Sequence, residues 1–198
     1  MNIYRSRLLL TLILLPGTVL SELTHETDPS TGLESWSWRD DEVTVEMIQR
    51  LPDQTRGFFL ARGFPPAAVE RIALGCLFQT IIRNTATDGP SVHIDLSKWQ
   101  IRSGSSTKDI RLKSDWDQEW KETGVSREAR IAFRWALFPT VQSFESGDYN
   151  WGMTTMDLPP GTRFDLHLTW LIDNEAREAI IPDMQCPLDR HPGPPALP

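Results

Sequence analysis

The sequence is poor in cysteine and tyrosine, with two of each, and beyond its first residues it has no long run of apolar side chains. A membrane-spanning helix needs roughly 20 such residues, so we expect no stable span in the mature chain. Basic residues are also few, 20 Lys and Arg against 27 Asp and Glu, for a net charge of −7. This balance argues against nucleic acid as the partner and leaves a protein or a small-molecule ligand.

Several catalytic signatures are also missing. The chain has no G-x-S-x-G, H-E-x-x-H, P-loop or C-x-x-C motif. Two His/Asp pairs, His93 with Asp95 and His167 with Asp165, have the i, i+2 spacing that can orient an imidazole, although such pairs are also typical of a solvated sheet face. We expect a non-catalytic protein. A hydrolase-like enzyme with undetermined catalytic carboxylates is an alternative, because carboxylates need only be close in space.

The first 21 residues have the pattern of a secretory signal. Arg5 and Arg7 precede an apolar run over residues 8–15, and Ser21 supplies a small side chain at the expected cleavage site. The run is too short to span a membrane. We therefore expect an exported protein, periplasmic or secreted, whose partner is a protein or small-molecule ligand in the cell envelope.

The two cysteines, Cys76 and Cys186, form an even pair in a chain expected to reach an oxidising compartment. Such a pair predicts a disulfide bond. Closing a loop of this size contributes about 4 kcal/mol in the chain-entropy model. Two free thiols or a thiolate metal site are the alternatives.

The hydrophobic pattern predicts an antiparallel, immunoglobulin-like β-sandwich with two or three short helices. Apolar residues at every second position favour strands over 76–84, 91–99, 129–138, 149–156, 163–172 and 176–181. Spacings of three or four, with capping residues, favour helices over 41–51, 65–73 and 114–124. The expected organisation is a signal peptide over 1–21, a flexible lead-in over 22–40 in which Trp36 and Trp38 could dock as an edge strand, a sandwich domain over 41–187 and a Pro-rich disordered tail over 188–198.

Two strongly alternating segments predict the core. The inward positions of 129–138 and 163–172 should be buried together, namely Phe133, Trp135, Phe164, Leu166, Leu168 and Trp170.

Eight tryptophans are many for this length, and they bear on function. Exposed indole rings are common at sites that bind sugars, peptides or proteins. Trp116 and Trp120 are expected to dock their helix, whereas Trp36, Trp38, Trp99 and Trp151 are candidates for a recognition surface. The segment "GDYNWGM" (147–153) combines turn residues with large rings, and the predicted binding residues are Asp148, Tyr149, Asn150, Trp151 and Trp99.

A metal site is the other alternative. Met153, Met156 and His167 carry the thioether and imidazole groups that suit copper(I), as in an envelope copper carrier. On a regular strand, however, Met153 and Met156 are three residues apart and point to opposite faces. The expectation is therefore no cofactor, with copper as the alternative.

The leader makes a direct prediction. The protein isolated from the medium or periplasm of a secreting host should have the intact mass of a chain that begins at Glu22 and contains no free thiol. A chain that still begins at Met1 would show that the first 21 residues are not a cleaved signal.

Overall fold

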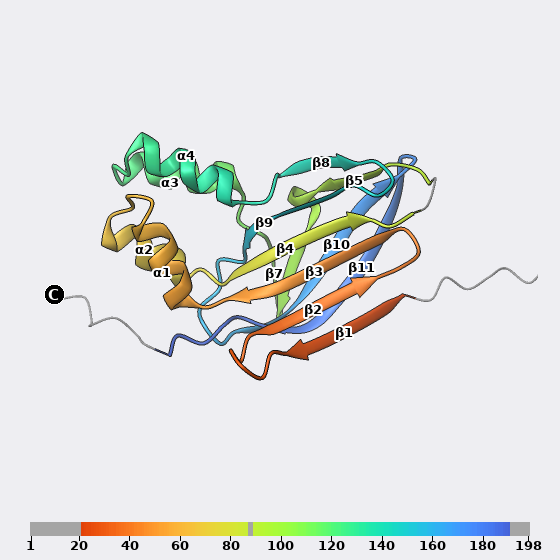
Figure 1. The fold of residues 1–198 in the computed structure, drawn as a ribbon, viewed down its shortest axis with the longest axis horizontal. Coiled ribbons are helices and arrows are strands. Elements are labelled where there is room, and N and C mark those ends of the chain that lie inside the picture. The colour runs from red at the N-terminus through yellow and green to blue at the C-terminus, as the bar shows by residue number, and fades with distance from the viewer. Residues whose placement is uncertain (1–20, 87–88, 191–198) are drawn as a thin grey trace, which may run out of the picture.

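The structure is a computed structural model and describes residues 21–86 and 89–190. Within these residues the chain forms two antiparallel β-sheets and four α-helices (Figure 1). The first sheet has the order β1-β2-β3-β4-β9. Its strands are β1 (Glu22–Thr27), β2 (Glu34–Arg39), β3 (Val43–Arg50), β4 (Leu77–Asn84) and β9 (Tyr149–Thr155). The mainly β prediction is thus confirmed.

The second sheet is built around one long strand. Its strands are β5 (Val92–Asp95), β6 (Gln100–Ser103), β7 (Ser106–Asp109), β8 (Val141–Phe144), β10 (Arg163–Ile172) and β11 (Glu175–Gln185). Strand β10 pairs with β11 along one edge, and on its other edge with β6 and then with β5. A short 3-10 turn, η1 (Leu96–Lys98), separates β5 from β6. The sheet is completed by β7 beside β6 and β8 beside β5.

The inward faces of the two sheets share one hydrophobic core, which gives the sandwich-like arrangement. Trp38 of the first sheet lies 5.0 Å from Trp170 of the second, and Phe78 lies 6.0 Å from Phe164, both measured between ring centroids. The predicted inward positions of β10 are all buried, namely Phe164, Leu166, Leu168 and Trp170.

The four helices gather at one end of the sheets (Figure 1) and enclose a second hydrophobic cluster. They are α1 (Pro52–Leu60), α2 (Pro66–Ala73), α3 (Lys113–Glu122) and α4 (Arg127–Ala136). The helices predicted over 65–73 and 114–124 correspond to α2 and α3. Helix α1 begins at a proline, a residue that is tolerated in a first turn because its missing N–H would have no intrahelical partner there.

The helix predicted over 41–51 is wrong. Residues 43–50 form strand β3, which pairs with β2 and β4. The prediction relied on Val43 and Met47 at a spacing of four, but four is also a multiple of the strand period of two. Val45 lies midway between them and is buried as well. In a strand it shares the face of Val43 and Met47, whereas in a helix it would point away from them, so its burial identifies a strand.

The strand predicted over 129–138 is also wrong, because residues 127–136 form helix α4. Ser126 caps it by accepting the Ala129 N–H, and Ala129 and Phe133 face the helical cluster one turn apart. Trp135 then falls on the solvent side, where it is 84% exposed. Phe133 is buried, but in the helical cluster and not in the core that contains β10.

The lead-in predicted over 22–40 contains strands β1 and β2. Trp36 and Trp38 are buried, and β2 lies between β1 and β3, so it is an inner strand and not an edge. All six residues of β1 are exposed, which explains why the sequence of this edge strand has no apolar pattern. The predicted tail is described only as far as Arg190, and the signal peptide only at Ser21.

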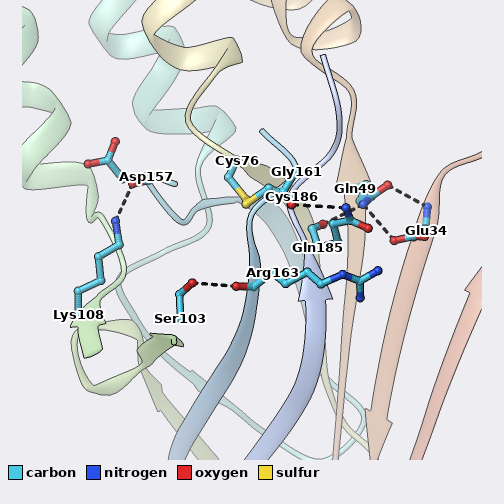
Figure 2. The surroundings of a disulfide bond; sticks show 10 residues. All are labelled: Glu34, Gln49, Cys76, Ser103, Lys108, Asp157, Gly161, Arg163, Gln185 and Cys186. Atoms are coloured by element: carbon cyan, nitrogen blue, oxygen red, sulfur yellow. Dashed lines mark hydrogen bonds between the residues drawn. A yellow bond between two sulfur atoms is a disulfide. The ribbon is translucent and has the colours of Figure 1, made fainter. Parts of the chain in front are cut away.

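The predicted disulfide between Cys76 and Cys186 is present, with 5.1 Å between the Cα atoms. Figure 2 shows how it connects the segment before β4 to the end of β11 and so joins the two sheets. Buried Gln49 of β3 makes a second connection beside it, because its amide nitrogen donates to the Gln185 carbonyl over 2.8 Å.

Charged side chains attach the helices to the sheets. Arg71 of α2 and Arg111 both bind Glu119 of α3 and Asp157, and both guanidinium groups lie over the ring of Trp116. The Trp116 indole N–H in turn donates to the side-chain oxygen of Thr155 in β9, over 2.8 Å. These contacts position helices α2 and α3 against the end of strand β9.

Arg56 of α1 makes a second set of contacts, to Asp53, Glu70 and Asp189. Hydrogen bonds from its guanidinium to Asp189 and then to Glu70 raise the pKa of Arg56 above its usual value. The segment after β11 is thereby attached to the first two helices.

Truncation of the core tests the assignment of β10. Phe164→Ala should lower the free energy of unfolding by about 3 to 5 kcal/mol, because it leaves a cavity beside Phe78. Trp135→Ala is the matched control and should change stability by about 0.5 kcal/mol or less, since that ring is exposed. Chemical denaturation measures both, and a larger loss for Trp135→Ala would contradict the placement of α4.

Candidate binding surface

The candidate surface is the outward face of the first sheet beside strand β9. Tyr149 and Trp151 are two residues apart on this strand, so both rings point outward, and they are 57% and 63% exposed. Six of the eight tryptophans are buried, and the exposure of Trp151 is therefore unusual in this chain. Two of the predicted binding residues thus share one face.

Neighbouring strands complete this surface. Tyr149 lies in register with Arg83 and, one strand further, with Thr44, while Trp151 lies in register with Ile81 and then Glu46. With Gln79 these side chains line a shallow depression of about 290 Å³, which we call the sheet hollow. Its lining residues are Thr44, Glu46, Gln79, Ile81, Arg83, Tyr149 and Trp151.

A cation–π contact orients one of the two rings. The guanidinium carbon of Arg83 lies 4.6 Å from the centroid of the Tyr149 ring. Contacts of this type are worth about 0.5 to 1 kcal/mol at an exposed site. Arg83 and Glu46 are the charged side chains of the sheet hollow, so its lining has no net charge.

The turn before β9 fixes where this strand begins. Gly147 has a φ of +82°, and its N–H donates to the carbonyl of buried Asn84. Asp148 accepts the Glu145 N–H through its carboxylate and the Asn84 N–H through its carbonyl. Asp148, predicted as a binding residue, therefore uses its carboxylate to form the turn.

Asn150 is likewise engaged within the protein. Its amide nitrogen donates to the Gln142 side chain on β8, over 2.6 Å, and its oxygen accepts the Trp151 N–H. It thereby links the edge strands of the two sheets and holds the backbone that carries Trp151.

The structure does not place Trp99 with these residues. Its side chain is 1% exposed, and its indole N–H donates to the Thr169 carbonyl. The prediction continued the strand alternation from His93 to position 99, but the turn η1 interrupts that alternation after Asp95. A ring buried in this way lacks the exposed face that the prediction assumed.

The segment that follows α4 covers part of the free edge of β9. The Phe138 N–H donates to the Met153 carbonyl, and a methyl group added at Gly152 would lie 2.5 Å from the Phe138 nitrogen. This close approach of two backbones requires glycine at position 152.

The possible metal ligands lie in three separate environments. Met153 packs in the helical cluster, Met156 packs in the core between the sheets, and His167 lies on the outward face of β10. The opposite directions of the two methionines agree with their three-residue spacing. Among the described residues, no three His, Cys, Asp or Glu side chains group closely enough to hold a metal ion.

The two His/Asp pairs have other partners. Asp95 accepts the Ser97 N–H, and the Asp165 carboxylate accepts the Asp183 N–H. The His93 ring lies 3.0 Å from the Ser143 hydroxyl. Burial of Asp95 acts to raise its pKa, but hydrogen bonds from Ser97 outweigh it and lower the pKa, so this carboxylate stays ionised and caps η1.

No helix in the described ranges 21–86 and 89–190 is long and apolar enough to cross a membrane.

Comparisons with protein-family models, with curated proteins and with solved structures find no match to this chain.

Sequence reasoning missed the floor of the sheet hollow. Gln79, Ile81 and Arg83 occupy alternate positions of β4, a strand that the sequence predicts. The polar side chains of Gln79 and Arg83 are the signal in the sequence that this face is partly solvated. Thr44 and Glu46 lie within residues 41–51, whose spacing predicts a helix, so the sequence does not place them on this sheet, whereas the structure has them in β3.

The exposure of the two rings predicts the effect of removing them. Tyr149→Ala and Trp151→Ala should each leave the melting temperature within a few degrees, since substitutions at exposed positions change stability by about 0.5 kcal/mol. Gly152→Ala, next to them, should cost about 1 to 3 kcal/mol because the added methyl group meets the Phe138 backbone. Thermal unfolding of the three variants checks this, and unfolding by either ring truncation would place the rings in the core.

Proposed function

We propose that the protein binds a partner protein or a small ligand, without catalysis, through the sheet hollow. The observation that carries this proposal is the exposure of Tyr149 and Trp151 beside one another on a strand whose backbone is held by β4 on one edge and by Phe138 on the other. Large exposed aromatic rings next to polar groups are typical of recognition surfaces. A rigid strand holds such rings in position before the ligand arrives, which reduces the entropic cost of binding.

We also propose that the protein is exported and acts in the cell envelope or outside the cell. The apolar leader over residues 1–21 and the disulfide between Cys76 and Cys186 support this, because disulfides persist in oxidising compartments. The immunoglobulin-like form of the sandwich remains a prediction, supported by a disulfide that joins the two sheets.

Photo-crosslinking tests the proposed surface even though the ligand is unidentified. Benzoylphenylalanine replaces Trp151 in the full chain produced in its native cells, and Trp135 is replaced in the same way as the control, since both rings are exposed but only Trp151 lines the sheet hollow. We expect a discrete adduct from position 151 and none from position 135. Adducts from position 135 alone would contradict the proposal, and adducts from neither position would exclude a protein partner at this surface.

A further inference from the structure

The chemistry of the sheet hollow identifies the class of ligand, an inference that rests on the proposed function. The floor is apolar at Ile81, the rings of Trp151 and Tyr149 stand at one side, and Glu46, Gln79 and Arg83 supply polar groups. A carboxylate accepts hydrogen bonds, a guanidinium donates them and an amide does both. The ligand must therefore combine an apolar face with a rim of groups that both donate and accept.

Part of the edge of β9 is already paired, which limits the addition of an extended peptide as a further strand at this edge. Such binding needs free backbone groups along the edge. Here the Met153 carbonyl accepts the Phe138 N–H, and the Thr155 carbonyl accepts the Arg111 N–H. The Trp151 N–H is taken by the Asn150 side chain.

The rest of the outward face argues against a broad protein interface. The outward residues of β1 and β2 are Glu22, Thr24, Glu26, Ser35, Ser37 and Arg39. A stable interface buries about 800 Å² on each partner around an apolar centre. On this face the exposed large apolar side chains are confined to β9, so the area suits a small ligand. The volume of about 290 Å³ is just below the range of roughly 300 to 1,000 Å³ that is typical of small-molecule sites.

The charge of the residues that line the sheet hollow narrows the class of ligand further. The sheet hollow contains one acidic and one basic side chain, Glu46 and Arg83, so its lining does not favour a ligand of either charge. A pyranose ring has an apolar face of C–H groups and a rim of hydroxyls that both donate and accept. We propose that the sheet hollow binds a neutral oligosaccharide, with one sugar ring stacked on Trp151 and its hydroxyls hydrogen-bonded to Glu46, Gln79 and Arg83.

Calorimetric titration of the oxidised full chain tests this proposal. The probes are cellohexaose, maltohexaose, xylohexaose, mannohexaose and hexa-N-acetylchitohexaose, with hexagalacturonate as the anionic comparison. We expect at least one neutral hexasaccharide to bind with a dissociation constant in the millimolar range or tighter, and more tightly than hexagalacturonate. Trp151→Ala should weaken that binding at least about tenfold, because the stacking surface is removed. Trp151→Phe should retain part of it, and Trp135→Ala should leave it unchanged.

The outcomes separate this inference from the proposed function. Failure of all five neutral probes at millimolar concentration, preferential binding of hexagalacturonate, or binding that survives Trp151→Ala would each overturn the oligosaccharide assignment. A protein adduct from position 151 in the crosslinking experiment, together with failure of the sugars, would leave the sheet hollow as a binding surface for a protein. Failure of both experiments would reject the surface altogether.

Discussion

The connection between the two sheets at the Cys76–Cys186 bond is the constraint on which the other features depend. This covalent bond joins the first sheet to the end of β11, and closing a loop of about this length contributes about 4 kcal/mol in the chain-entropy model by restricting the unfolded chain. The hydrogen bond from Gln49 to Gln185 lies beside it and keeps the two sheet ends in register. With this end closed, the core aromatic pairs of the sheets meet along the length of β10.

Strand β9 connects this sandwich to the helical end of the molecule. Along one strand, Met153 contributes to the helical cluster while Trp151 points to solvent, and Met156, just beyond the strand, belongs to the core between the sheets. The strand is held by β4, by the segment after α4 and by the side chain of Asn150. The position of the exposed rings is therefore determined by contacts on several sides, although the rings themselves contribute little to stability.

The sequence predicted the strongly alternating strands well and the ambiguous segments poorly. The alternation of 163–172 identified β10 and its buried face, because both the apolar and the polar positions followed the same period. Residues 43–51 and 129–137 had apolar side chains at spacings of two and four, which fit a strand and a helix equally. Tertiary contacts decide such cases: β2 and β4 flank the first segment, and the helical cluster receives Phe133 from the second.

The candidate surface was predicted in part for similar reasons. Tyr149 and Trp151 were found because rings and turn residues occur together within a few positions of sequence. Their neighbours Thr44 and Arg83 come from other strands, and only the register of the sheet reveals that they are adjacent. Trp99 was misplaced because a three-residue turn changes the phase of a strand without any proline or glycine to mark it.

The position of the two cysteines also sets the order in which the molecule can be completed. Cys76 precedes β4, whereas Cys186 follows the last strand of the second sheet, 110 positions later. Strands β1 to β4 are sequential neighbours and can pair as soon as they emerge during synthesis. The covalent closure cannot occur until β10 and β11 have been made, so any chain that stops short of β11 carries an unpaired thiol at Cys76. That unpaired thiol chemically distinguishes incomplete molecules from finished ones.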